Sequence, residues 1–248
     1  MTISTILVMT RFTLQHPPDD PHRRGLTGRL NWLRAGILGA NDGIVSVASI
    51  VVGVAAATNE TGPILTAGAA ALVGGAISMA LGEYVSVSSQ SDTERTLIAR
   101  ERHELETMPE DELAELAHVY EARGLTPETA RLVAKELTAR DPLGTHLDVE
   151  FGIDQADLVS PWNAALASGV AFTIGGLLPF LAMLTPAGIR IPLTFVAVLI
   201  ALPATGAIGA RVGESPMAPA AIRVLVGGAL ALIATFIIGN VLGTLGVV

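Results

Sequence analysis

One carboxylate stands alone inside an apolar run near the start of the chain. Asp42 is the single charged residue between Gly36 and Ala57, a run of 22 residues that could cross the ~30 Å hydrocarbon core of a bilayer as a helix. Inserting a charge at such a depth costs on the order of 2.5–3.5 kcal/mol, so intramembrane carboxylates usually mark ion pathways, proton relays or ion sites. Asp42 therefore predicts a transporter. The alternative is a structural carboxylate that caps a broken helix or pairs with a buried arginine.

A second apolar run, Pro63–Tyr84, carries sulfur and a carboxylate near its end. Met79 and Glu83 lie one helical turn apart, and Asp42 could face them from the first run. A thioether beside carboxylates can bind a borderline transition metal, whereas a site for Mg²⁺ or Ca²⁺ does not use sulfur. These residues predict a metal site within the membrane. The alternative for Met79 is packing, which is the usual role of methionine in a helix interface.

Residues 91–159 contain the third group of candidate ligands. Its members stand three or four residues apart on shared helix faces: Glu101 with Glu104, Glu112 with Glu115, and His146 with Glu150. Carboxylates with one imidazole suit Mn²⁺, Fe²⁺ or Zn²⁺, and the alternative is a solvated acidic face. Glu115 and His118 also form one E-x-x-H pair of the kind found twice in di-iron bundles. With a single copy present, His118 is expected to be solvated.

The composition shows which elements must position these residues. Half of the residues are hydrophobic, the mean hydropathy is +0.56 and there is no cysteine, so thiolate ligands and disulfides are excluded. The apolar residues form five runs, the last three without any charge: Gly36–Ala57, Pro63–Tyr84, Pro161–Leu184, Ile191–Ala210 and Val224–Val248. We therefore predict an all-α polytopic membrane protein with five transmembrane helices.

Basic residues predict the orientation. The first loop has no basic residue and the third loop has only Arg190. Arginines gather before the first run, at Arg23, Arg24, Arg29 and Arg34, and in the fourth loop, at Arg211 and Arg223. The positive-inside rule places the N-terminus and residues 91–159 in the cytoplasm and the C-terminus outside. Residues 1–34 do not resemble a cleaved signal peptide and are expected to form a mostly disordered cytoplasmic tail. Residues 35–90 and 160–248 are expected to hold the transmembrane helices.

The segment between the second and third runs is strongly acidic. Residues 91–159 contain 17 acidic and 7 basic residues, whereas the rest of the chain contains 6 and 8. Residues 91–107 continue the second helix without a breaker, and helix signals then predict three further helices: Pro109 to Arg123, Pro127 to about Arg140 with Thr126 as N-cap, and Pro142 to about Phe151. These predict a small cytoplasmic helical bundle inserted between transmembrane helices two and three.

Several motifs resemble those of one known family. They are the N-D-G of Asn41–Gly43, the G-A-I-S-M-A-L-G-E-Y of Gly75–Tyr84 with the V-S-V-S-S-Q that follows, and Tyr120 with Gly124-Leu125. Over about residues 30 to 248 the chain resembles the vacuolar iron transporter family. The resemblance implies a homodimer of five-helix protomers that exchanges Fe²⁺, often also Mn²⁺, for protons between the two first helices. It also implies a cytoplasmic helical domain that binds metal.

The resemblance assigns roles to individual residues. It makes Asp42 and Met79 the membrane ion site, and it assigns these ligands in the insert: Glu101, Glu104, Glu112, Glu115 and Glu150. Two positions depart from the best-described branch of the family. His146 replaces a methionine, which keeps a metal site plausible but alters its preference toward Zn²⁺. Ala71 replaces a membrane carboxylate, and Glu83 is the candidate to supply that charge from another depth.

The function predicted from the sequence is transport rather than catalysis. We expect a non-enzymatic antiporter in the cell membrane that expels Fe²⁺ or Mn²⁺ from the cytosol, without a resident cofactor and without nucleic-acid binding. One alternative is a membrane-anchored metal store or sensor, in which the spans serve only as a tether. Another is a ferroxidase-like enzyme built on Glu115 and His118, which lacks the second E-x-x-H pair.

Overall fold

Five long helices dominate the computed structural model, which describes residues 26–154 and 159–246. Each is long and apolar enough to cross a membrane: α1 (Leu26–Ala57), α2 (Thr61–Thr107), α6 (Pro161–Ala182), α7 (Ala187–Val212) and α8 (Met217–Thr244). They correspond one to one with the five predicted spans, so the protein is a multi-pass membrane protein. Most of the predicted tail, residues 1–25, lies outside the described residues.

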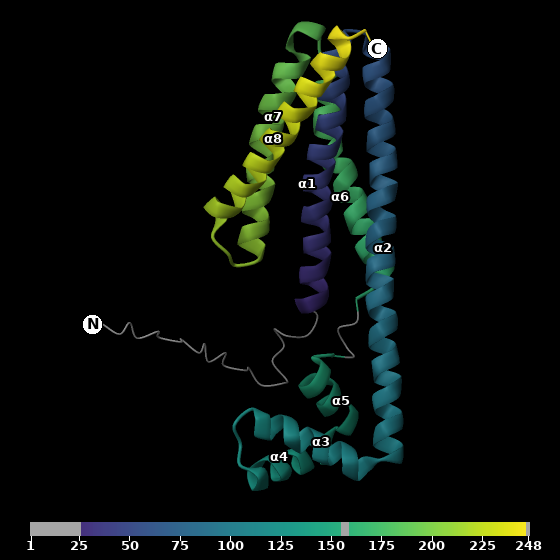
Figure 1. Cartoon of the computed structure of the whole chain (residues 1–248), viewed down its shortest axis with the longest axis vertical. Helices are drawn as coiled ribbons and strands as arrows, with labels where there is room; N and C mark the ends of the chain where they lie inside the picture. The colour runs from purple at the N-terminus through teal and green to yellow at the C-terminus, as the bar shows by residue number, and fades with distance from the viewer. Residues whose placement is uncertain (1–25, 155–158, 247–248) are drawn as a thin grey trace, which may run out of the picture.

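Helix α1 is the centre of this assembly. It packs against α2 and α6 on one side and against α7 and α8 on the other, and α7 and α8 also pair with each other (Figure 1). The buried core runs along α1, with Val47, Val51 and Val52 fully enclosed. Large apolar side chains on the outer helix faces, such as Leu166 and Ile200, remain exposed, as expected for surfaces that face lipid.

Glycines let α1 approach its neighbours closely. A Cβ at Gly43 would overlap the backbone of Phe172 in α6, and one at Gly239 of α8 would overlap the carbonyl of Gly53. Inside a bilayer no hydrophobic force drives helices together, so they associate through close van der Waals packing, which small residues at these crossings allow. Three glycine pairs stand four positions apart along the long helices: Gly39/Gly43, Gly209/Gly213 and Gly239/Gly243. In the first and the last, both glycines lie against the backbone of another helix, whereas Gly209 contacts the side chain of Ile37 and Gly213 approaches only its own helix.

We expect Gly43→Ala to destabilise the protein by about 1–3 kcal/mol, because the added methyl must push α6 away from α1. Thermal unfolding of the purified protein in detergent measures this. Gly36→Ala is the matched control on the same helix, since nothing lies within 4 Å of a Cβ at Gly36. Equal melting temperatures for the two variants would contradict the close α1–α6 contact.

The helices extend beyond the predicted runs. Helix α1 begins at Leu26 rather than near Gly36, and α8 begins at Met217 rather than Val224. The predicted runs began after Arg34 and Arg223, because a charged residue interrupts an apolar pattern. The backbone hydrogen bonds of a helix continue through a charged residue, so the helices themselves begin earlier. Arg223, for example, lies inside the first turns of α8 and donates from Nε to the carbonyl of Pro219, 3.3 Å away.

Helix α2 is by far the longest element. Its 47 residues span about 70 Å at 1.5 Å per residue, more than twice the hydrocarbon thickness of a bilayer. Short helices follow its far end: α3 (Pro109–Ala122), α4 (Pro127–Arg140), α5 (Pro142–His146) and the wide-turn helix η1 (Leu147–Phe151). They lie beside the lower part of α2, away from α7 and α8 (Figure 1).

The predicted signals of these short helices operate as expected. Thr126 Oγ1 accepts from the backbone N–H of Thr129, and Asp141 Oδ1 accepts from the N–H of Gly144 at 2.9 Å. Gly124 follows α3 with φ at +100°, a region in which glycine is favoured. One prediction was wrong in detail: the last helix is not continuous, because the chain widens into η1 after His146.

Candidate functional site

A groove between α1 and α2 gathers the predicted membrane residues. Asp42, Met79 and Glu83 all line it, and its volume is about 450 Å³. Asp42 Oδ1 accepts a hydrogen bond from Ser46 Oγ at 2.8 Å. Met79 also packs against the apolar core, so its packing role and its place on the groove coexist. The groove therefore offers two carboxylates and one thioether to a cation.

The position that departs from the family pattern lies on the same groove. Ala71 lines the wall near Asp42 and Met79 but contributes no oxygen. The second carboxylate of the groove, Glu83, lies twelve positions further along α2, about 18 Å away along the helix axis. Glu83 therefore stands one helical turn from Met79 but does not replace a carboxylate at the depth of Ala71.

Sequence reasoning missed two hydroxyl groups of the groove. Ser46 and Ser78 both line it. Ser46 could have been found, because it stands one helical turn after Asp42 and residues four apart share a helix face. Next to it, the Asn41 side-chain oxygen accepts a hydrogen bond from Thr205 Oγ1 of α7. This bond fixes the turn of α1 that carries Asp42.

Aromatic residues indicate the depth of the groove. Both tryptophans of the chain, Trp32 and Trp162, lie exposed at the end of the bundle that faces α3–α5, and the ring of Trp162 lies 4.7 Å from that of Tyr84. Tryptophan and tyrosine concentrate at bilayer interfaces. Asp42 stands ten residues beyond Trp32, about 15 Å along the helix, which is near the middle of the hydrocarbon core. Glu83, beside Tyr84, is expected at headgroup level.

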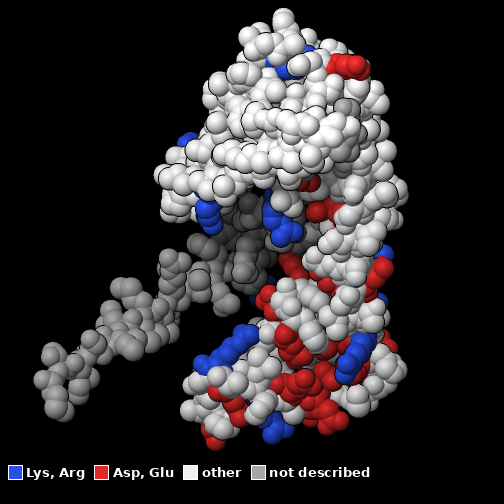
Figure 2. Space-filling view, turned by 45° about the horizontal axis from the view of Figure 1, so that its top comes forward, with Lys and Arg blue, Asp and Glu red and all other residues white. Residues whose placement is uncertain are grey.

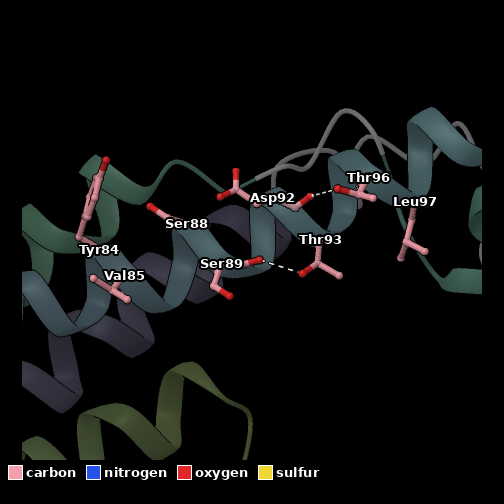
Figure 3. A pocket seen from close by; sticks show the side chains of 8 residues that line it. All are labelled: Tyr84, Val85, Ser88, Ser89, Asp92, Thr93, Thr96 and Leu97. Atoms are coloured by element: carbon pink, nitrogen blue, oxygen red, sulfur yellow. Dashed lines mark hydrogen bonds between the residues drawn. The ribbon is translucent and has the colours of Figure 1, made fainter.

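A larger hollow, further along α2 toward the insert, carries none of the predicted residues (Figure 3). It has a volume of about 580 Å³ and is lined by one helix, from Tyr84 to Leu97. The hydroxyls of Thr93 and Thr96 donate to carbonyls of their own helix. Two of its hydroxyls are bonded within the helix, and its lining includes one carboxylate, Asp92, and no thioether. This hollow is therefore a weaker candidate for an ion site than the groove.

A second cluster lies where α2, α3, α5 and η1 meet. Glu101, Glu112 and His146 are buried, and one potential ligand atom from each lies within 4.8 Å of the others. The imidazole is the centre of the cluster: His146 Nδ1 lies 3.1 Å from Glu101 Oε1, 3.1 Å from Glu150 Oε1 and 3.7 Å from Glu112 Oε2. Four elements thus bring four of the six predicted insert ligands together.

The cluster is short of hydrogen bonds. His146 Nδ1 and Nε2, Glu101 Oε1 and Glu150 Oε1 are buried, yet none of them forms a hydrogen bond of good geometry with a described residue. Buried polar atoms are almost always hydrogen-bonded, so each exception needs an explanation. A metal ion would supply the missing partner, because carboxylate oxygens and a neutral imidazole nitrogen are ligands for Mn²⁺, Fe²⁺ and Zn²⁺.

Burial and like charges make the cluster retain protons. Burial, helped by the carboxylates of Glu150 and Glu112, raises the pKa of Glu101 to about 7. Burial and the neighbouring Glu115 raise the pKa of Glu112. Burial alone would lower the pKa of His146, but the carboxylates of Glu150 and Glu101 outweigh it and the pKa is raised. A cation must therefore displace protons to bind here.

The other two predicted insert ligands lie outside the cluster. Glu104 pairs with Arg100, with 2.9 Å between Nε and Oε1, and Glu115 is exposed on α3. His118 is exposed too, as expected, and its nearest carboxylate is that of Glu121 at 3.8 Å. Acidic side chains crowd this part of the surface (Figure 2), so exposure alone does not distinguish a ligand from a solvated residue.

We expect Glu112→Gln to weaken Mn²⁺ binding at least tenfold and Glu115→Gln to change it by less than about threefold, because a buried carboxylate contacts the cation directly while an exposed one acts through water. The two residues stand one turn apart on α3, so they form a matched pair. Calorimetric titration of the purified full chain compares them. Equal losses would place Glu115 among the ligands.

Comparison with known proteins places the chain in a family. The model of the VIT family matches residues 33–240, a range that contains the groove and the buried cluster. The chain belongs to the VIT family. Among curated proteins, a vacuolar iron transporter of Acanthamoeba castellanii is 42% identical over 92% of this chain and 85% of its own length.

Plant proteins of the family are also similar. A vacuolar iron transporter homolog 2 of rice is 35% identical and covers 88% of this chain and 94% of its own length. A vacuolar iron transporter homolog 4 of Arabidopsis thaliana is 34% identical over 88% of this chain. In this VIT-family chain the matched region covers most of α1 and α8 and all of α2, α6, α7 and the acidic segment. The curated relatives are named as transporters rather than as enzymes.

Proposed function

We propose that the protein moves Fe²⁺, Mn²⁺ or both out of the cytosol through the membrane in exchange for protons. The observation that carries the proposal is the groove between α1 and α2, in which Asp42, Met79 and Glu83 line one continuous surface. The names of the curated relatives support iron as a cargo. A membrane tether would not need a carboxylate near mid-bilayer, which argues against a pure metal store or sensor.

The proposed transport step exchanges a cation for protons at the groove. Asp42 and Met79 replace part of the hydration shell of the cation. When the cation leaves, protons that enter from the far side take its place in the groove and prevent its return. The groove opens to the surface of a single chain. A second copy placed against it would double the ligands and enclose the cation, which supports a homodimer.

The buried cluster of the acidic insert has a separate role in this proposal. With the N-terminus and residues 91–159 in the cytoplasm, and the C-terminus outside, Glu101, Glu112, His146 and Glu150 would capture the cation before transport. The unbonded buried atoms of the cluster support metal binding. The ferroxidase alternative has less support, because Glu115 and His118 are exposed and do not converge on the cluster.

The test is metal uptake into proteoliposomes with an imposed pH gradient. We expect Fe²⁺ and Mn²⁺ to accumulate on the side opposite the insert, at a rate that rises with the proton gradient and collapses when a protonophore removes it. Binding without flux would favour the store or sensor. Flux that ignores the proton gradient would retain transport but refute antiport.

Met79→Leu is expected to slow Fe²⁺ and Mn²⁺ flux severalfold while changing stability by less than ~1.5 kcal/mol, because leucine conserves volume but lacks the thioether. Initial uptake rates and melting temperature measure the two effects. Met183→Leu is the matched control, because Met183 is fully buried in the same apolar core and does not line the groove. Normal flux from Met79→Leu would leave Met79 with a packing role only.

A further inference from the structure

The carboxylate of Glu150 is carried by a very short element. Helix η1 has five residues, far too few for a helix to be stable by itself in water. It ends at Gly152, whose φ is +66°, and the N–H of Ile153 closes the turn by donating to the carbonyl of Leu147 at 2.9 Å. These local bonds shape η1 but do not fix it relative to α2 and α3, which carry the other carboxylates.

One side chain spans that gap. Arg123, at the end of α3, donates from Nη2 to the carbonyl oxygen of Val149 at 2.8 Å, across 26 positions of the chain. Its guanidinium carbon lies 5.6 Å from the ring centroid of Tyr120, a cation–π contact that restricts the arginine head. Val149 packs its side chain against the small core of Leu116 and Ala117. Arg123 thus joins the end of α3 to the middle of η1.

The bonded carbonyl is adjacent to the ligand. The carbonyl of Val149 and the backbone nitrogen of Glu150 belong to one planar peptide unit, so a hydrogen bond to the former restricts the latter. Glu150 Oε1 lies 3.1 Å from His146 Nδ1. Helix α3 also carries Glu112, three turns before Arg123. Helix α3 therefore supplies one ligand, Glu112, and through Arg123 at its end holds the backbone beside a second ligand, Glu150.

We propose that Arg123 is a positioning residue for the metal site of the insert, acting through Glu150. The proposal rests on the proposed metal binding by this cluster. Arg123 does not touch the cation: it holds the Val149–Glu150 peptide so that the carboxylate of Glu150 faces His146. Outer partners that orient metal ligands typically change metal affinity by 10–100-fold when they are removed.

The test is a double-mutant cycle on the full chain in detergent, with Mn²⁺ as the titrant. Arg123→Met retains the aliphatic stem but lacks the donor, and we expect it to weaken Mn²⁺ binding about tenfold. In the Glu150→Gln background the same change should have little further effect, because the residue that it positions is already lost. Arg123→Lys keeps a donor and should recover part of the affinity.

Arg131→Met is the matched control, since Arg131 is exposed on α4, and it should bind Mn²⁺ as the unmodified protein does. Equal losses from Arg123→Met in both backgrounds, or no loss in the unmodified one, would overturn the role of Arg123 while the site itself stands. If the unmodified protein binds no Mn²⁺, the capture role and this inference both fail. Unchanged circular dichroism excludes general unfolding as the cause of a loss.

Discussion

Replacing Asp42 by asparagine should abolish metal flux in proteoliposomes and leave folding intact. The amide keeps the shape of the side chain and can still accept from Ser46 Oγ, which lies 2.8 Å from Asp42 Oδ1. It loses the charge that attracts a cation and the group that takes up the returning proton. A loss of at least 100-fold is expected, because a neutral amide cannot perform either step.

The matched control is Asp92→Asn, which makes the same change on α2 further toward the insert, outside the groove. That variant should transport normally, and both variants should show the melting temperature of the unmodified protein. Full flux from Asp42→Asn would remove Asp42 from the mechanism and return it to a structural role. A large drop in the melting temperature of Asp42→Asn would also indicate a structural role for Asp42.

Acidification from pH 8 to pH 6 is expected to weaken Mn²⁺ binding at the buried cluster by about tenfold or more. A ligand with a pKa of about 7, as for Glu101, must lose its proton before it binds a cation, and this factor alone changes the affinity by about tenfold over that interval. His146, whose pKa is raised above its usual value, adds to the dependence. Titrations at several pH values measure it.

His146→Met should flatten this dependence only in part and shift preference away from Zn²⁺. Unperturbed carboxylates titrate mainly near pH ~4, so without the histidine they alone would leave little pH dependence near neutrality. Burial of Glu101 changes that expectation. His118→Met, at an exposed position, is the control and should behave as the unmodified protein. Superimposable curves for His146→Met and the unmodified protein would show that His146 is not a ligand.

The same pKa shifts fix the sign of a stability effect in metal-free protein. The pKa of Glu101 is raised from 4.5 to about 7 in the folded chain, so between these two values the folded state binds more protons than the unfolded state. The raised pKa of Glu112 acts in the same direction. Stability of the cluster is therefore highest at acid pH and falls as the pH rises through 7. Bound Mn²⁺ should reverse the trend, since it neutralises the carboxylates once their protons leave.

The sequence predicted the linear organisation well. Five runs gave five long helices, and Thr126 and Asp141 cap the helices that they were expected to cap. These features depend on neighbours within a few positions, which a pattern can capture. Helix ends at arginines were missed, because Arg223 and Arg211 lie inside helices whose backbone bonds do not depend on side-chain polarity.

Convergence in space could not be predicted from spacing. The pairs Glu101/Glu104 and Glu112/Glu115 looked equivalent, yet one member of each is buried in the cluster while the other pairs with Arg100 or faces solvent. The choice depends on how α2, α3 and η1 meet, and thus on the turn at Met108 and the widening after His146. The hydrogen bond from Arg123 to Val149 crosses 26 positions and leaves no periodic signal.

The unbroken course of α2 ties the two sites together mechanically. Met79 on the groove and Glu101 in the cluster stand on one helix without a proline or a described break between them, separated by about 33 Å at 1.5 Å per residue. A small tilt of such a straight helix at one end produces a larger displacement at the other. A tilt of about 5° around the groove displaces Glu101 by about 3 Å over that length, which is comparable to the distances that hold the cluster together. Because α3 follows α2 directly through Met108, a tilt of α2 against α1 would carry Glu101 and the short helices packed around it toward or away from the mouth of the groove.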